Sequence, residues 1–321
     1  MVLLNVIAYL TANFEYAKEC QSFFNALQGC MAVRNGANKE GKLYWFHAFM
    51  MGIFLSFSGG SFGTLWLGKP TSMLSNDVNI ACCILAFILV NYVPFSIGYK
   101  LANTFPVVLA TTCFAQLFRS SGLVSYCSVA FETFKGNPSE YYPIPVFGPI
   151  IYASLLGNMG GFFNKGFTGH LQKGMPWSFQ TGLACATFYH FYVHDETGFV
   201  GIHLRHCFHL VFDDFLKISG LDNLDRATLA FVFVSAFQQI MAILQLPYFL
   251  GPSANPFNAL YYFVPEETPA AKPKALQKNQ ESSPSNTGTK ESNTAPDSDN
   301  NGTKKKKKKK KKGAQQKDKD L

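Results

Sequence analysis

Long apolar stretches recur along residues 1–264, and short polar segments separate them. A helix needs about 20 apolar residues to cross the roughly 30 Å hydrocarbon core of a bilayer, and most of the stretches approach that length. The first stretch is the weakest of them. We predict seven transmembrane helices, which lie within residues 1–33, 45–67, 80–99, 105–131, 145–163, 178–193 and 227–250.

The composition changes near Pro265. Residues 265–321 contain no aromatic residue and are rich in Lys, Ser, Asn, Thr and Pro, so they bury too little apolar surface to offset chain entropy. These residues contain 15 lysines and 8 acidic residues, so they carry +7 of the formal charge of +8. The high pI therefore comes from this segment and does not indicate that a folded surface binds nucleic acid. We predict a transmembrane domain at residues 1–264 and a disordered, lysine-rich cytosolic tail at residues 265–321.

Basic residues gather in alternate loops between the predicted spans. The loops on one side, which also holds the tail, contain Arg34, Lys39, Lys42, Lys100, Lys165 and Lys173. The loops on the other side are mixed or acidic. The positive-inside bias places the tail in the cytosol and the amino terminus in the lumen or outside the cell.

We expect no cleaved signal peptide at the amino terminus. Most of the cysteines lie inside apolar runs, which does not suggest a disulfide framework.

Two glycine clusters interrupt the second and fifth spans at corresponding places. They comprise Gly59, Gly60 and Gly63 in the second span and Gly157, Gly160 and Gly161 in the fifth. An odd span count with this polarity suggests a 3+3 inverted repeat plus one extra helix. Glycine lets a helix unwind, and the freed carbonyls are tolerated only where protein or water covers them, so matched breaks predict a permeation path. The alternatives are close helix packing and a bundle of seven unrelated helices.

Few ionisable residues lie within the predicted spans, and Arg119 is one of them. A cation inside a membrane helix is costly, and it usually faces a cavity, a partner or a lipid headgroup. We therefore predict a functional role for Arg119. The alternative is that Arg119 reaches the membrane interface from a helix shorter than predicted.

Several local motifs occur in a characteristic order. Residues 65–70 read Leu-Trp-Leu-Gly-Lys-Pro, Pro94 precedes a Tyr-Lys pair at residues 99–100, and residues 105–107 read Phe-Pro-Val. Together with the paired glycines, this order resembles the trimeric intracellular cation channel family, known as TRIC. The resemblance covers residues 20–193 and returns at the last span and the basic tail.

The resemblance implies a homotrimer in the endoplasmic reticulum membrane. Each protomer would hold a pore for monovalent cations, chiefly potassium, which balances charge as calcium leaves the store, and the six glycines would line that pore. The family is not enzymatic, and no cofactor is implied. Arg119 matches the arginine of a Lys–Arg pair that holds a phosphoinositide headgroup in the family, but Ala115 stands at the lysine position and removes a phosphate contact. Leu156 replaces a basic residue of vertebrate members, so their voltage dependence is not carried over.

The tail carries two further signals. Nine consecutive lysines at residues 304–312 are expected to stay extended, and they either contact anionic lipid weakly or only keep the tail soluble. Lys317 and Lys319 fit a cytosolic dilysine retrieval signal, which agrees with residence in the reticulum.

Two other functions remain open. An inverted-repeat secondary transporter uses the same architecture as a channel. The histidines at positions 190, 194, 203, 206 and 209 also have spacings found in membrane di-iron oxygenases. Against a metal site, residues 200–216 form an amphipathic pattern, which suggests a helix on the luminal surface or an extension of the sixth span, with its histidines facing water.

Overall fold

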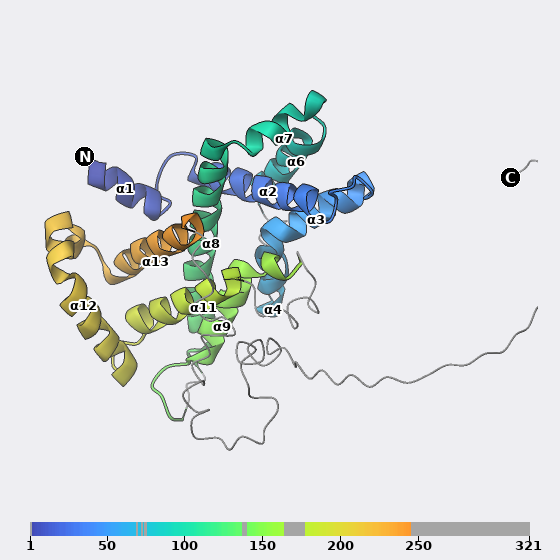
Figure 1. Cartoon of the computed structure of the whole chain (residues 1–321). Helices are drawn as coiled ribbons and strands as arrows, with labels where there is room; N and C mark the ends of the chain where they lie inside the picture. The colour runs from blue at the N-terminus through green and yellow to red at the C-terminus, as the bar shows by residue number, and fades with distance from the viewer. Residues whose placement is uncertain are drawn as a thin grey trace, which may run out of the picture. The chain divides into compact units, whose positions relative to one another are not determined.

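The computed structural model describes residues 2–68, 70, 71, 73, 76–136, 140–163 and 177–244 (Figure 1). The predicted tail and its signals lie outside the described residues. The regular structure within them is helical, as expected. The helices in the first half are α1 (Val2–Leu10), α2 (Ala17–Asn35), α3 (Trp45–Ser58), α4 (Thr64–Trp66), α6 (Asp77–Asn91) and α7 (Ile97–Ala102). The helices in the second half are α8 (Phe105–Phe134), α9 (Phe147–Asn158), α11 (Trp177–Tyr189), α12 (Phe199–Ser219) and α13 (Arg226–Ile243).

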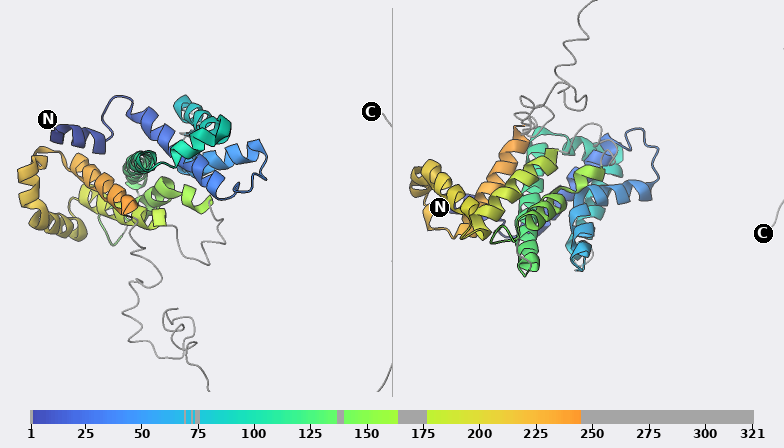
Figure 2. Two further views of the ribbon diagram at one scale, coloured as in Figure 1. Left: turned by 45° about the horizontal axis from the view of Figure 1, so that its top comes forward. Right: turned by 90° about the horizontal axis from the view of Figure 1, so that it is seen from below.

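The main helices form two groups of three that meet at α8. Helices α2, α3 and α6 pack together around a core that includes Leu27, Phe57 and Phe87. Helices α8, α9 and α11 pack around a second core that includes Leu123 and Ala153, and α13 packs against α8 and α11. Figure 2 shows α8 nearly end-on in its left view, with helices of both groups around it. Helix α8 thus connects the two groups through its contacts with α2 and α13.

Three described helical stretches are long and apolar enough to cross a bilayer. They are Trp45–Trp66, Phe105–Phe134 and Arg226–Ile243. Asp77–Asn91 and Pro94–Ala102 together would make a fourth, but they are bent by 90° at the break between them. The predicted second, fourth and seventh spans are therefore supported, whereas the count of seven is not confirmed. The third was predicted as one continuous span, and the bend at Pro94 corrects it.

The weak first span is two helices rather than one. The chain turns between α1 and α2, where Ala12 and Tyr16 adopt positive φ angles of 57° and 60°. Only α2 packs into the first group, and α1 contacts α13 instead. Helix α2 is also much more polar than its neighbours, and it buries Gln21, Ser22 and Asn25. Neither helix is among the described stretches that are long and apolar enough to cross a bilayer, so the predicted first span is not confirmed.

A buried carboxylate separates α11 from α12. A π-helical turn, η3 (His190–His194), ends α11, and Asp195 follows it with its side chain fully buried. The Asp195 carboxylate accepts hydrogen bonds from the backbone amides of Gly198 (2.8 Å) and Gly201 (2.7 Å) and from the Tyr142 hydroxyl (2.5 Å). Because these bonds fix a turn, α12 is a separate helix and does not extend the sixth span. Burial and the hydrogen bond to Asp195 raise the pKa of Tyr142.

Candidate pore

The first glycine cluster changes the type of helix. Residues Gly59–Gly63 form a π-helical turn, η1, between α3 and α4. Two carbonyls beside the turn accept hydrogen bonds from side chains of other helices: Ser56 from the Asn25 amide (2.7 Å) and Gly63 from the Tyr152 hydroxyl (2.8 Å). Such bonds allow an irregular helix at membrane depth. The helix therefore changes type at the first cluster, while Trp45–Trp66 remains one continuous helical stretch.

The second glycine cluster interrupts the fifth span. Helix α9 ends at Asn158, Met159 lies in a turn, and helical structure resumes at residues 160–163. Helix α9 has 12 residues, or roughly 18 Å at 1.5 Å per residue, so it does not cross a bilayer by itself. The helical hydrogen-bond pattern thus changes at both clusters, as a π-helical turn at the first and as a turn at Met159 in the second, and a permeation path at these glycines stays a prediction.

The two broken segments cross each other through reciprocal contacts. A Cβ atom at Gly59 would overlap the carbonyl of Leu156, and a Cβ atom at Gly160 would overlap the carbonyl of Leu55. Leu55 precedes Gly59 by the same number of residues as Leu156 precedes Gly160. Two segments related by a two-fold axis make this kind of paired contact, in which each presents the same surface to the other. The crossing supports the inverted repeat, and it shows that Gly59 and Gly160 are sites of close helix packing.

A cavity of about 640 Å³ lies beside this crossing. Five of the six predicted glycines line it, and Gly63 instead packs against the Leu156 side chain. The polar groups on its wall come from both helix groups. They include Lys18, Gln21, Ser22, Gln28, Ser56, Asn79, Arg119, Ser121, Ser125, Asn158 and Ser178. The described wall therefore offers many hydroxyl and amide oxygens, two cations and no carboxylate.

Helix α2 contributes a polar stripe that the sequence analysis missed. Lys18, Gln21, Ser22 and Gln28 all face the cavity, because residues three, four and seven positions apart share one face of a helix. The Ser22 hydroxyl donates to the Asn79 side chain of α6 at 2.7 Å. The signal that identifies them is this polar periodicity, which a search for apolar stretches passes over.

Arg119 lies midway along α8 and faces the same cavity. Its Nη2 donates to the Gln28 Oε1 of α2 at 2.7 Å, so it joins the two helix groups. Ala115, at the position of the family lysine, is fully buried and does not line the described cavity. Leu156 is likewise buried, at the crossing itself. Arg119 is therefore at the predicted pore, and its role toward a lipid headgroup stays a prediction.

A comparison with known protein families gives one match that decides the classification. A model described as "TRIC channel" matches residues 35–209, which is more than half of the chain. The chain belongs to the TRIC channel family. The resemblance that we identified from local motifs is thereby confirmed, and the glycine crossing, Arg119 and most of the cavity wall fall inside the matched region. Family membership also agrees with the expectation that this membrane protein is not an enzyme.

The fold is similar to solved structures of TRIC channels. One is a trimeric intracellular cation channel from C. elegans in the absence of Ca²⁺, with a TM-score of 0.51, 16% sequence identity, and coverage of 76% of this chain and 95% of that chain. A second is the C. elegans channel with bound Ca²⁺, with a TM-score of 0.50, 14% identity, and coverage of 76% and 98%. At these identities the likeness shows the TRIC fold. A comparison with curated protein sequences gave no match.

The histidines do not gather around a metal in the part of the chain that is described. No group of three or more His, Cys, Asp or Glu side chains there is placed to hold an ion. His190 and His194 lie in η3 against Phe131, while His203, His206 and His209 are exposed on α12. The histidines are thus divided between a buried turn and a surface, and the described part of the chain does not bring all five of them together.

Proposed function

We propose that this TRIC family protein is a potassium channel of the endoplasmic or sarcoplasmic reticulum that supplies counter-ion flux during calcium release. The observation that carries the proposal is the polar cavity beside the reciprocal glycine crossing. Amide, hydroxyl and backbone oxygens suit partly dehydrated monovalent cations, because they replace water without binding the ion too tightly to leave. The absence of a carboxylate from the described wall argues against a tight site for a divalent cation.

The proposed assembly and orientation rest on other features. We propose a homotrimer with one pore in each protomer, a luminal amino terminus and a cytosolic carboxyl terminus. The positive-inside distribution supports the orientation. The family supports the trimer and the location in the reticulum. Phosphoinositide binding at Arg119 is a weaker proposal, since α8 carries no second cation beside it.

Single-channel recording of the purified protein in planar bilayers tests the proposal. We expect discrete potassium currents, with sodium conducted and with chloride and calcium conducted much less when they are substituted. A carrier completes a conformational cycle in microseconds to milliseconds, so it passes too few ions for a resolved unitary current. Absence of unitary currents, together with potassium uptake into vesicles, would replace the channel with a transporter.

Replacing Arg119 with Gln should raise the potassium conductance about two-fold. Two unit positive charges separated by about 10 Å of water repel each other by about 0.4 kcal/mol, and removing a charge at such a separation lowers the barrier by that amount. The Arg119→Lys variant keeps the charge and is the matched control, with an expected conductance near that of the original protein. If Arg119→Gln left the conductance unchanged, a bound phosphate would be the better explanation, because it already neutralises the arginine.

A further inference from the structure

A second cavity, of about 650 Å³, lies at one end of the first helix group, away from the glycine crossing. It is formed where α2 ends, α3 begins and α6 gives way to α7. Its wall includes Arg34, Lys39, Trp45, Tyr92 and Tyr99. The cavity therefore combines two cations with three amphipathic aromatic side chains.

The break between α6 and α7 fixes the position of Arg34. Pro94 has no N–H group, so it cannot donate to the carbonyl four residues earlier, at Val90. The Arg34 Nη1 donates to that carbonyl instead, and its Nη2 donates to the Ser96 hydroxyl at 2.9 Å. The bend in the third span thus creates a carbonyl that needs a donor, and α2 supplies one.

The face of the Tyr99 ring contacts the same guanidinium. The Arg34 Cζ lies 4.0 Å from the centroid of the Tyr99 ring, and the Tyr99 hydroxyl donates to Asn35 Oδ1 at 2.6 Å. A guanidinium has five N–H donors, and the two hydrogen bonds to Val90 and Ser96 use two of them. Arg34 is therefore a rigidly placed cation with donors left for an acceptor in the cavity.

Lys39 adds a second charge that no described carboxylate neutralises. Glu40 pairs with Lys42 rather than with Lys39, and Lys42 does not line the cavity. No acidic side chain is part of the described wall. A cavity with two cations and no anion of its own favours an anionic ligand, and a fixed guanidinium is well suited to phosphate oxygens.

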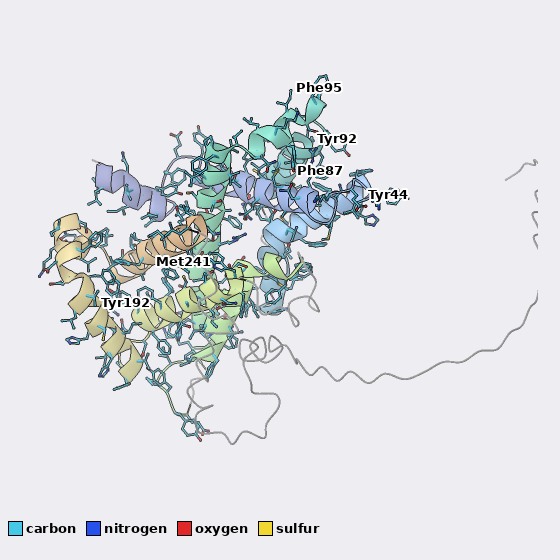
Figure 3. The ribbon with its side chains drawn as sticks, in the orientation of Figure 1. Tyr44, Phe87, Tyr92, Phe95, Tyr192 and Met241 are labelled. Carbon is cyan, nitrogen blue, oxygen red and sulfur yellow. The ribbon has the colours of Figure 1, made fainter. Side chains whose placement is uncertain are left out.

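The aromatic side chains indicate the depth of the cavity in the membrane. Figure 3 labels Tyr44, Phe87 and Tyr92 near the ends of α3 and α6, where the Phe87 and Tyr92 ring centroids are 5.7 Å apart. Tyr44, Trp45 and Tyr92 are exposed. Exposed Trp and Tyr at helix ends are typical of the headgroup level, and the basic loops predict that this end faces the cytosol. Basic pockets between helices on that side bind anionic headgroups.

We propose that this cavity binds a phosphate group through Arg34 and Lys39, with the phosphate supplied by the headgroup of an anionic phospholipid or by a free phosphate. The site is separate from the candidate pore and does not depend on potassium conduction. Trp45 lies on the wall, so its fluorescence is placed to report a ligand that enters the cavity.

The test uses the full-length protein in detergent with Trp66→Phe and Trp177→Phe, which leaves Trp45 as the one tryptophan. Its fluorescence is titrated with dioctanoyl phosphatidic acid, with dioctanoyl phosphatidylcholine and with inorganic phosphate. We expect phosphatidic acid to shift the emission, and Lys39→Gln to weaken its apparent affinity about five-fold. Lys42→Gln, in the same loop and outside the cavity, should change the affinity less than two-fold.

The arms of the titration separate the two sources of phosphate. A response to phosphatidic acid that depends on Lys39 and is absent with inorganic phosphate assigns the site to a lipid. An equally Lys39-dependent response to inorganic phosphate assigns it to a free phosphate. Equal responses in the Lys39→Gln and Lys42→Gln variants, or equal binding of phosphatidylcholine, would overturn the proposal. Both substituted lysines are exposed, so loss of folding does not obscure the result.

Discussion

Replacing Gly59 with Ala should lower the melting temperature of the purified protein by about 10 °C and abolish its unitary currents. The new Cβ would overlap the Leu156 carbonyl, which belongs to the backbone of another helix and cannot rotate away. Overpacking of this kind costs about 3 kcal/mol, and each kcal/mol corresponds to roughly 3 °C in a protein of this size. Thermal unfolding followed by intrinsic fluorescence measures the first effect, and bilayer recording measures the second.

Gly157→Ala is the matched control because it lies in the other glycine cluster and also lines the cavity. A Cβ atom there would be 3.4 Å from the Leu123 Cβ, which is ordinary contact. We expect a change of less than about 3 °C for this variant. A similar loss of stability in both variants would mean that glycine flexibility, rather than the crossing, is what the fold requires.

Replacing Asp195 with Ala should destabilise the protein by about 4 kcal/mol, the largest effect that we expect outside the crossing. The substitution removes three hydrogen bonds to a charged acceptor and leaves the Gly198 and Gly201 amides buried without it. The start of α12 and its connection to Tyr142 depend on those bonds. Thermal unfolding should show a decrease of about 12 °C.

Glu196→Ala provides the control for Asp195. Glu196 is adjacent, carries the same charge, and forms an exposed ion pair with Arg226 at 3.2 Å. Exposed ion pairs contribute about 0.5 kcal/mol, so the melting temperature should change by only about 2 °C. If the two variants were equally stable, the buried network around Asp195 would not be what holds α12 in place.

The irregular helical turns at the two glycine clusters were predictable because glycine is the residue that most readily permits them. The clusters at residues 58–63 and 157–161 were visible without any structure, and both contribute to the cavity. The sequence did not reveal their mutual contact, since a carbonyl such as that of Leu156 carries no side-chain signal. A glycine can bend its helix, or it can let another helix pack closely against it. Which of the two occurs depends on the tertiary contacts of the glycine, and those are seen only in the folded structure.

The polar wall of the cavity was harder to predict for a different reason. Hydropathy averages over a stretch, so α2, with Gln21, Ser22 and Gln28 on one face, appears only as a weak span. Hydropathy also carries no information about the direction of the helix axis. The sequence analysis therefore treated the segment around Pro94 as the end of a straight helix, although the chain bends there. In both cases, polar groups that lower the hydropathy of a segment form hydrogen bonds with other helices in the folded protein.

The glycine crossing has a consequence for suppressor genetics. A Cβ atom at Gly63 would meet the side chain of Leu156, and a smaller residue at position 156 removes that obstacle. A Cβ atom at Gly59 would meet the carbonyl of Leu156, which every amino acid possesses. A substitution of Gly63 can therefore be suppressed by a smaller residue at position 156. A substitution of Gly59 cannot be suppressed at position 156, and a substitution of Gly160 cannot be suppressed at position 55, because the clash is with a backbone carbonyl.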